Sequence, residues 1–394
     1  MRSKIALIPK IFIYKLNYFF GWPKVMPINL TLSISNACMS RCKTCNIWQK
    51  KCQELNISEW EKILKSVGPS PYWITISGGE PFLQNHLVDL IKLIYQYNQP
   101  AIINIPTNAI LSHIIPQKVE EIIKACPKTQ FVVNISVDGV GDKHDAIRGV
   151  KGNFEKVIEV LSSLKELKIH NKNLNIGLHT VVSNFNVDNL AELFDWALAQ
   201  QPDQYIMEIA EERVELDTVG MDITPSLEKF KKATDLLMDK LKSQKFKGLS
   251  RTFPEYPTAY CVDEGVSNKS FRRGFRPRWK VRDLSRITEA FRKEYYKLVQ
   301  RYLADKKQPI PCFAGRASAQ IYCDGTIWPC CVRADDLGNL REYDYDFKKI
   351  WLSEKSETVR ESISNKECAC PLANAAYTNM LINFRTLFKV ILSL

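Results

Sequence analysis

The chain has 394 residues, of which 45% are hydrophobic and 25% are charged. This composition is ordinary for a folded globular protein, and it excludes a mainly disordered chain, a collagen-like repeat and a multi-span membrane protein. The net charge is +12, and the run Arg272–Arg286, with seven basic residues and one acid, supplies half of it. Because no signal peptide stands out, we expect a cytoplasmic protein with reduced thiols, whose clustered cysteines are metal ligands or catalytic groups.

In chain order, residues 1–28 form a mixed apolar and basic segment, and six strand–helix units then follow. The predicted strands are 29–35, 72–77, 101–106, 131–137, 174–182 and 204–209. The predicted helices are 58–67 with Ser58 as N-cap, 87–97, 116–126, 153–167, 187–199 and 224–242. Strict alternation predicts a parallel sheet with right-handed crossovers. Six units are too few for a closed eight-stranded barrel, so we expect an α/β fold with a partial (β/α)6 TIM-like barrel over residues 29–243. Its chemistry should lie at the carboxyl ends of the strands.

The alternation stops after the sixth unit. Residues 244–311 read as a linker or insertion that holds the basic run and one helix, near 286–303. Aromatic residues lie in and beside that run, which is typical of single-stranded nucleic-acid or phosphorylated-substrate sites; a solvated surface insertion is the favoured interpretation. Residues 312–372 predict a small C-terminal α+β extension, and residues 373–394 an amphipathic helix.

The strongest motif is the cysteine triad Cys38, Cys42 and Cys45, spaced C-x3-C-x2-C directly after the first strand. Three thiolates on one tight loop can hold three irons of a cubane cluster and leave the fourth iron without a protein ligand. A zinc site would want four ligands, so the triad fits zinc less well.

The turn Gly78-Gly79-Glu80 closes the second strand. Two glycines allow a backbone to approach a ligand closely, and Glu80 offers a carboxylate to an ammonium group. Together with the cysteine triad, this turn resembles the radical SAM (radical S-adenosylmethionine) superfamily over roughly residues 29–243. That family has a partial barrel, and it often has an aromatic residue where this chain has Trp48.

The resemblance implies a set of contacts to S-adenosylmethionine. The Gly78-Gly79-Glu80 turn corresponds to the site of the amine. Asn108 lies in Thr107-Asn108-Ala109, where the family has Thr-Asn-Gly. Ser136, at the end of the fourth strand, corresponds to a ribose contact, and Arg148 to a contact with the carboxylate.

A second set of cysteines lies near the C-terminus and resembles the SPASM and Twitch extensions of radical SAM enzymes, which bind auxiliary iron–sulfur clusters. The cysteines present suit one cluster, as in the shorter Twitch form. The expected ligands are Cys312, Cys330, Cys368 and Cys370, with Cys331 as the rival of Cys330. A zinc site is the alternative, because four thiolates suit zinc equally.

Other polar residues carry weaker signals. We expect Cys52, Cys126, Cys261 and Cys323 to be free, buried thiols, because they lack partners at ligand spacing. His179 in the fifth strand reads as a satisfied core histidine more readily than a catalytic one. Glu208, Glu211 and Glu212 follow the sixth strand, where substrate groups belong, but solvated loop acids are the favoured interpretation.

The two ends of the chain, Ile5–Phe20 and Met380–Leu394, are apolar with scattered lysine and arginine. Either end fits the interface of a membrane, and neither is suited to span one. Packing against the barrel is the favoured alternative.

These features together predict an enzyme. The resemblance implies reductive cleavage of S-adenosylmethionine at a [4Fe–4S] cluster to a 5′-deoxyadenosyl radical. That radical would abstract a hydrogen atom from a substrate. The expected partners are an auxiliary cluster, an electron donor such as flavodoxin or ferredoxin, and a small-molecule, sugar or lipid-linked substrate.

Two alternatives stay open. The first is a peptide- or protein-modifying radical SAM enzyme, of the RiPP or sulfatase-maturation type. Only 28 residues precede the first predicted strand, too few for the peptide-binding domain that such relatives often carry. The second is a non-catalytic metal-binding scaffold that docks nucleic acid through the basic run; we do not expect nucleic acid as the main partner.

Overall fold

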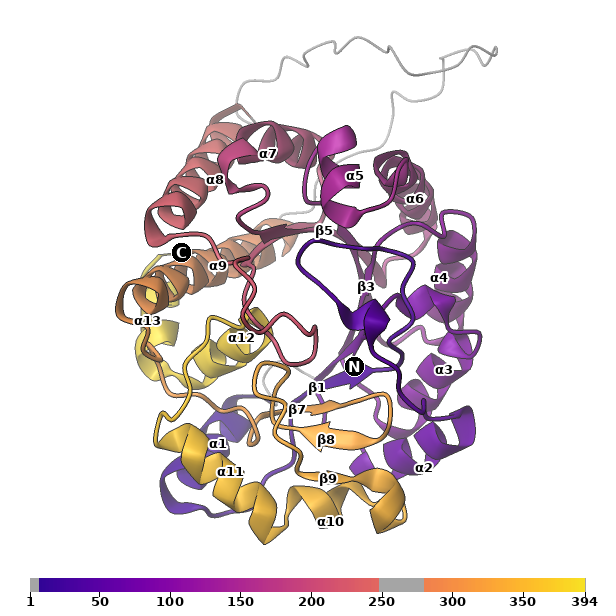
Figure 1. Ribbon diagram of the computed structural model, residues 1–394, viewed down its shortest axis with the longest axis vertical. Coiled ribbons are helices and arrows are strands. Elements are labelled where there is room, and N and C mark those ends of the chain that lie inside the picture. The colour runs from indigo at the N-terminus through magenta and orange to yellow at the C-terminus, as the bar shows by residue number, and fades with distance from the viewer. Residues whose placement is uncertain (1–6, 248–279, 394) are drawn as a thin grey trace.

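The computed structural model describes residues 7–247 and 280–393, and its centre is a nine-stranded sheet in the order β6-β5-β4-β3-β2-β1-β7-β8-β9 (Figure 1). Six strands run parallel, each pairing with the next in sequence. They are β1 (Asn29–Ser33), β2 (Trp73–Ser77), β3 (Ile102–Thr107), β4 (Gln130–Ser136), β5 (Leu174–Val182) and β6 (Gln204–Ile209). All six lie within two residues of their predicted bounds, which confirms the α/β fold with an unclosed partial barrel.

Helices cover the outer face of these strands (Figure 1). In chain order they are α2 (Ile57–Val67), α3 (Leu87–Tyr97), α4 (Ile114–Ala125), α5 (Asp142–Arg148), α6 (Asn153–His170), α7 (Leu190–Ala199) and α8 (Leu227–Lys247). The apolar sides of all of these except the short α5 pack on the sheet in one continuous core.

Two local features differ from the prediction. The N-cap of α2 is Asn56 rather than Ser58, because the Asn56 side chain accepts hydrogen bonds from the backbone of Ser58 and Glu59. The Glu59 carboxylate in turn accepts a hydrogen bond from the Asn56 N–H, which completes a capping box. The short helix α5 was not predicted.

The C-terminal extension continues the sheet of the barrel. Strand β7 (Ser318–Ile321) pairs in parallel with β1, β8 (Thr326–Trp328) pairs antiparallel with β7, and β9 (Gly338–Asn339) pairs antiparallel with β8. Helices α10 (Phe347–Trp351) and α11 (Glu354–Ser364) follow. The second cysteine set is therefore fixed relative to the barrel by backbone hydrogen bonds.

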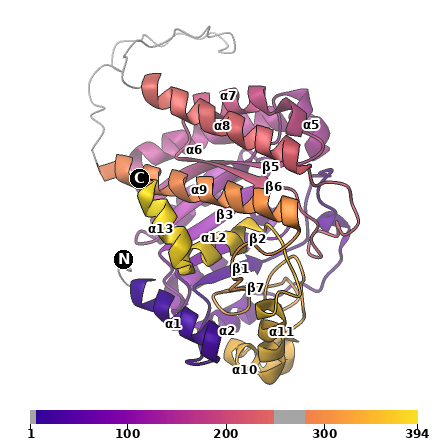
Figure 2. The same cartoon turned by 90° about the vertical axis from the view of Figure 1, so that its left-hand side faces the viewer.

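Two helices cover the open side of the barrel, between β6 and β7 (Figures 1 and 2). Helix α9 (Lys280–Asp305), which falls in the predicted linker and is longer than expected, buries Tyr295 and Tyr296 against the barrel core. Helix α12 (Ala373–Ile382) is tied to β1, where Asn29 donates to Asn374 at 2.6 Å and Asn374 donates to Thr31 at 2.8 Å.

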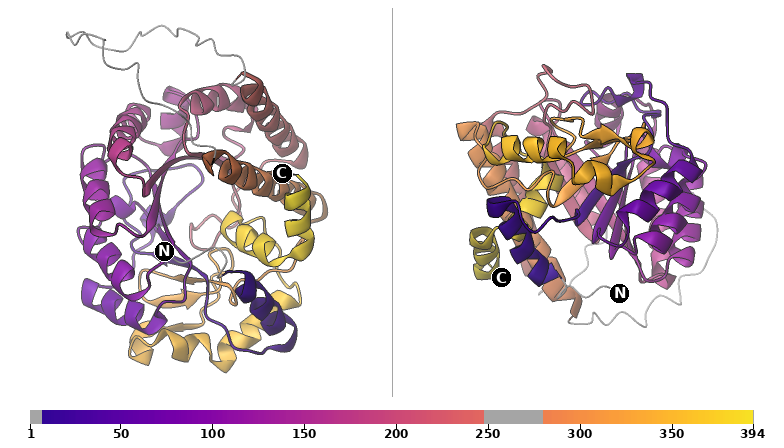
Figure 3. Two further views of the ribbon diagram at one scale, coloured as in Figure 1. Left: turned by 180° about the vertical axis from the view of Figure 1, so that it is seen from behind. Right: turned by 90° about the horizontal axis from the view of Figure 1, so that it is seen from below.

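The two ends of the chain lie on the same side of the protein. Where one C-terminal helix was predicted, the structure has two, because α13 (Phe384–Leu392) follows α12 after Asn383. Helix α1 (Leu7–Phe20) lies beside α13 (Figure 3). Nowhere in residues 7–247 and 280–393 is there a helix long and apolar enough to cross a membrane.

A disulfide joins Cys52 and Cys323, which corrects the expectation that both are free thiols. Leu55 donates a backbone hydrogen bond to Cys323 at 2.8 Å. The chain that follows the loop carrying Cys38, Cys42 and Cys45 (the cluster loop) therefore lies against the β7–β8 turn. The two residues are 271 positions apart, so spacing carried no signal of this pairing. Cys126 is free and fully buried, as predicted. Cys261 and most of the basic run lie outside the described residues.

Candidate active site

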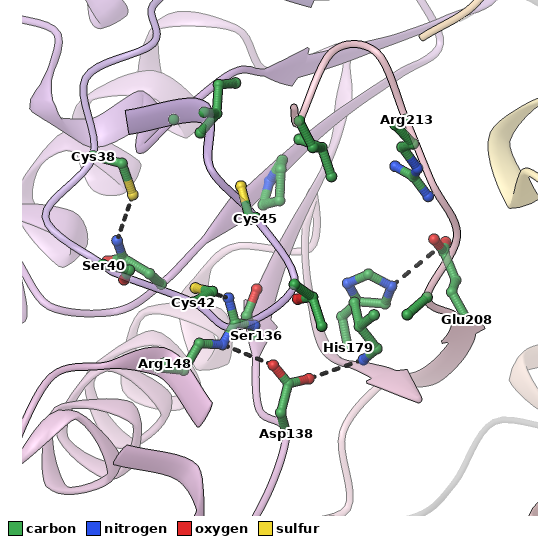
Figure 4. Close-up of a pocket in the computed structure, with 18 of the residues that line it drawn as sticks. Cys38, Ser40, Cys42, Cys45, Ser136, Asp138, Arg148, His179, Glu208 and Arg213 are labelled. Carbon is green, nitrogen blue, oxygen red and sulfur yellow. Dashed lines mark hydrogen bonds and ion pairs between the residues drawn. The ribbon is translucent and has the colours of Figure 1, made fainter. Parts of the chain in front are cut away.

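The three thiols of Cys38, Cys42 and Cys45 line one pocket at the carboxyl ends of the strands (Figure 4). Burial raises the pKa of Cys38, and it raises that of Cys45 to about 12. Without metal, the thiols of Cys38 and Cys45 therefore hold their protons, and bound iron would have to displace them. The buried hydroxyl of Ser40 lies in the same pocket and has no hydrogen-bond partner.

Helix α5 fixes the loop that carries this triad. The backbone N–H groups of Arg41 and Lys43 donate to the carbonyls of Arg148 and Ile147, each at 2.9 Å. Gly149, at φ 69°, ends the helix so close to the loop that a Cβ would lie 2.5 Å from the Arg41 carbonyl oxygen. A left-handed turn without a side chain is therefore required for this contact.

Arg148 lies inside the site rather than on the surface. Its Nε is 2.8 Å from Oδ2 of Asp138, and its Nη1 is 3.5 Å from the Cys42 sulfur (Figure 4). Asp138 is almost fully buried and accepts a second bond from the backbone of Val181 at 2.9 Å. The ion pair therefore holds the guanidinium toward the cluster loop. No role was predicted for Asp138 from the sequence, although it lies two residues after the end of β4.

The buried ring of His144 supports Asp138. Burial lowers the pKa of His144 to about 4, so the ring is neutral. Its Nδ1 accepts from the Asp138 N–H at 3.1 Å, which leaves Nε2 to donate to Asn153.

The Gly78-Gly79 turn also has a structural role within the chain itself. A Cβ on Gly78 would lie 2.2 Å from the Ser35 carbonyl oxygen, and one on Gly79 would lie 2.1 Å from that of Ala37. These glycines allow the end of β2 to press against the chain that leads into the cluster loop. Both also line the pocket.

Glu80 is buried, and three donors of its own chain hold it. It accepts from Thr107 at 2.9 Å and from the backbone of Phe82 at 3.2 Å and Asn108 at 2.7 Å. A carboxylate has about four acceptor positions, so about one remains for a ligand. Burial raises the pKa of Glu80 to about 7.

The ends of β3 and β4 complete the pocket. The Asn108 amide points at the Cys38 sulfur, 3.7 Å away, and Ser136 lines the pocket beside Asp138. Ala109 has a φ of 65°, the conformation for which glycine is suited. This explains why the family's turn has glycine at that position.

Polar groups at the ends of β5 and β6 contribute more to the pocket than the sequence predicted. His179 is no satisfied core residue, because it faces the pocket with its Nε2 3.5 Å from Glu208 (Figure 4). Glu211 is buried, and its Oε1 is 3.0 Å from Arg213. Of the three acids only Glu212 is a solvated loop residue. The position of these acids at the end of a barrel strand was the sequence feature that could have indicated their place in the pocket.

The pocket continues into a cavity of about 530 Å³ inside the barrel. His179, Glu208 and Arg213 line both spaces. At the far end of the cavity, Trp73 and Ile102 form an apolar wall at the starts of their strands, and Gln204 and Arg292 line the cavity beside it. Its size is that of a small-molecule site.

Burial raises the pKa of Glu211 to about 7, although Arg213 opposes this shift. The carboxyl of an unfolded chain titrates near 4.5. Between these values the folded protein keeps a proton that the unfolded chain releases, so the free energy of unfolding should fall as the pH rises through this window. We expect Glu211→Gln to reduce this fall, as measured by denaturant unfolding at about pH 5 and about pH 7. Identical slopes for the parent and the variant would contradict the assignment.

Cys312, Cys330, Cys368 and Cys370 line a second, separate pocket in the extension. Cys331 does not line it; it faces the interior cavity near Arg213. Burial raises the pKa of Cys330 to about 12. In the described part of the chain, no three His, Cys, Asp or Glu side chains converge where a single metal ion could be held.

Comparison with protein families matches this arrangement. Residues 32–197 match the model of the radical SAM superfamily, and residues 312–371 match that of the SPASM iron–sulfur cluster-binding domain. The chain therefore carries a radical SAM domain followed by a SPASM domain. Such proteins use a [4Fe–4S] cluster and S-adenosylmethionine, and SPASM domains bind additional iron–sulfur clusters.

Curated relatives include the sporulation killing factor maturation protein SkfB of Bacillus subtilis (strain 168). It is 24% identical over 176 residues, 43% of this chain and 39% of the relative. GTP 3′,8-cyclase of Alkaliphilus oremlandii is 28% identical over 188 residues, 46% of this chain and 55% of the relative. The chain spans about half the length of the curated relatives that it matches.

Solved structures share the fold. The structure titled native anSMEcpe with bound AdoMet has a TM-score of 0.59 at 14% identity, covering 93% of this chain and 99% of that one. Streptococcus suis SuiB has a TM-score of 0.55 at 14% identity, covering 85% of this chain and 68% of that one.

Proposed function

We propose that this protein cleaves S-adenosylmethionine reductively and uses the resulting 5′-deoxyadenosyl radical to abstract a hydrogen atom from a substrate. The observation that carries the proposal is that the thiols of Cys38, Cys42 and Cys45 and the residues expected to bind S-adenosylmethionine line one pocket. They are Gly78, Gly79, Glu80, Asn108, Ser136 and Arg148. This pocket leads directly into the interior cavity.

The residues present fit a [4Fe–4S] cluster. Three soft thiols face one pocket, and the buried Ser40 hydroxyl there lacks a partner. A bound cluster supplies the electron that splits the sulfonium of S-adenosylmethionine. Arg148, held by Asp138, places positive charge beside Cys42. Glu80 keeps about one acceptor position for the amine.

We assign the second pocket to one auxiliary iron–sulfur cluster held by Cys312, Cys330, Cys368 and Cys370. One observation supports a cluster over zinc. The SPASM match covers all four cysteines. The external electrons would come from a donor such as flavodoxin or ferredoxin.

The cavity favours a small-molecule or lipid-linked substrate with a polar head. His179, Glu208 and Arg213 lie at the end nearest the cluster loop, and Glu215 lies beyond them. Although burial opposes ionisation, His179 and Arg213 hold the pKa of Glu208 below its usual value. A head group with hydrogen-bond donors would meet this acidic end, and an apolar body would lie toward Trp73 and Ile102.

A peptide substrate is the second candidate. SkfB is named a maturation protein, and one structure of SuiB contains its precursor peptide. GTP 3′,8-cyclase acts on a nucleotide by its name. The relatives therefore span both classes.

The test compares substrate classes directly. Reconstituted protein with S-adenosylmethionine and a low-potential reductant is mixed with the lipid, small-molecule or peptide fraction of a cell extract. We expect slow basal release of 5′-deoxyadenosine, and faster release with the lipid or small-molecule fraction.

Ile206→Trp, which fills the cavity, should abolish the stimulation and spare the basal rate. Ile158→Trp, on the exposed side of α6, should change neither rate. Stimulation by peptides alone would favour the second candidate. A fully iron-loaded protein without any 5′-deoxyadenosine would contradict the proposal.

A further inference from the structure

Exposed apolar side chains gather on one face of the protein. Of the twenty large hydrophobic residues that are exposed in the described part, ten lie within residues 12–22 and 384–392. Phe20, Trp22 and Leu392 are each more than 70% exposed. Water-exposed apolar patches of this kind mark contact surfaces. We call the outward side of α1, residues 21 and 22, and α13 the terminal face.

The two ends form one surface although they are far apart in sequence. The rings of Phe12 and Phe384 lie 5.3 Å apart, and Lys15 Nζ lies 3.2 Å from the centre of the Phe384 ring. Figures 2 and 3 show α1 and α13 side by side on the side of the protein away from the cluster loop.

The inner side of α1 is fixed to the body of the protein. Arg316 donates to the Asn17 side chain at 2.9 Å, and the rings of Tyr18 and Phe313 lie 4.9 Å apart. Tyr14 is buried and donates to the Met26 carbonyl. Packing therefore uses only part of the helix and leaves Phe12, Leu16, Phe19 and Phe20 outward.

The charges of the two terminal segments have one sign. Residues 1–53 and 368–394 contain no aspartate or glutamate. Lys10 and Lys15 lie on α1, and the exposed Arg385 and Lys389 lie on α13 between its exposed apolar residues. Apolar side chains with interspersed cations complement the headgroups of an anionic bilayer. A second copy of this chain would bring the same positive charges together, which disfavours self-association through this face.

We propose that the terminal face binds the surface of an anionic lipid bilayer. The outward side chains of α1 and α13 enter the headgroup region, and the lysine and arginine residues contact lipid phosphates. Two helices on one rigid body act as two anchors, so neither has to bind the bilayer alone.

The position of this face bears on the interior cavity. Trp73 and Ile102, at the apolar end of the cavity, also pack against the cluster that contains Tyr14 of α1. Leu381, which lines the same end, lies three residues before α13. A docked protein would hold the apolar end of the cavity toward the bilayer, as a lipid-linked substrate requires. Docking itself does not depend on the catalytic proposal.

The test is co-sedimentation of the full chain with phosphatidylcholine vesicles that contain increasing phosphatidylglycerol. We expect binding to rise with the anionic fraction and to fall with added salt. The double variant Arg385→Ser/Lys389→Ser should weaken binding about fivefold for each charge. Phe388→Ser should weaken it about tenfold, since a 62% exposed ring leaves the lipid.

Matched variants at the opposite end of the barrel serve as controls. Val219→Ser removes an apolar side chain that is 67% exposed, and Lys143→Ser/Lys229→Ser removes two exposed charges. These changes should leave vesicle binding intact. Three results would overturn the proposal: absence of binding to anionic vesicles at low salt, equal losses in the control variants, or a dimer abolished by Phe388→Ser without vesicle binding. The assay needs no S-adenosylmethionine, so its failure would leave the proposed catalysis standing.

Discussion

Replacing Cys42 by alanine should reduce 5′-deoxyadenosine formation to background. One of three thiolates is lost from a cluster that has no spare protein ligand, and the partner of the Arg148 Nη1 atom disappears with it. Bound iron should fall by about half, since only the auxiliary cluster remains. The measurement is product formation and iron content of anaerobically reconstituted protein.

The fold should survive this substitution. The Cys42 side chain is only partly buried, so we expect the stability of the metal-free protein to change by less than about 1 kcal/mol. Cys126→Ala, at a buried free thiol outside both pockets, is the matched control and should keep the parent's product formation. A Cys42→Ala variant that still makes 5′-deoxyadenosine at the parent's rate would refute the role of the triad.

Replacing Cys330 or Cys370 by alanine should also halve the bound iron, with the opposite consequence for cofactor cleavage. Each substitution removes one of four thiols from the pocket in the extension, whereas the pocket at the carboxyl ends of β1 to β6 is untouched. Basal 5′-deoxyadenosine formation should therefore remain.

Cys331 provides the control, because it is adjacent in sequence but faces the interior cavity. Cys331→Ala should retain the parent's iron content. If Cys331→Ala loses iron and Cys330→Ala does not, the ligand assignment is reversed. An unchanged iron content in both Cys330→Ala and Cys370→Ala would contradict the presence of an auxiliary cluster at these cysteines.

The sequence by itself determined the barrel and the cluster loop. The strands are short apolar runs at regular intervals, and hydrophobic periodicity is a local property of the chain. The triad Cys38, Cys42 and Cys45 lies within eight residues, so its spacing alone predicted a cluster site. The Gly78-Gly79-Glu80 turn could also be identified from the sequence. The tight approach of its two glycines to Ser35 and Ala37 could not be predicted.

Only the tertiary structure decided what depends on contacts between distant segments. The pairing of β7 with β1, the disulfide between Cys52 and Cys323 and the ion pair of Asp138 with Arg148 join residues whose separation carries no local signal. The burial of Glu211 and the inward position of His179 depend on which way each strand faces the barrel. Likewise, α1 and α13 are separate apolar segments in the sequence, and they become one face because α12 and the start of β1 are hydrogen-bonded to each other.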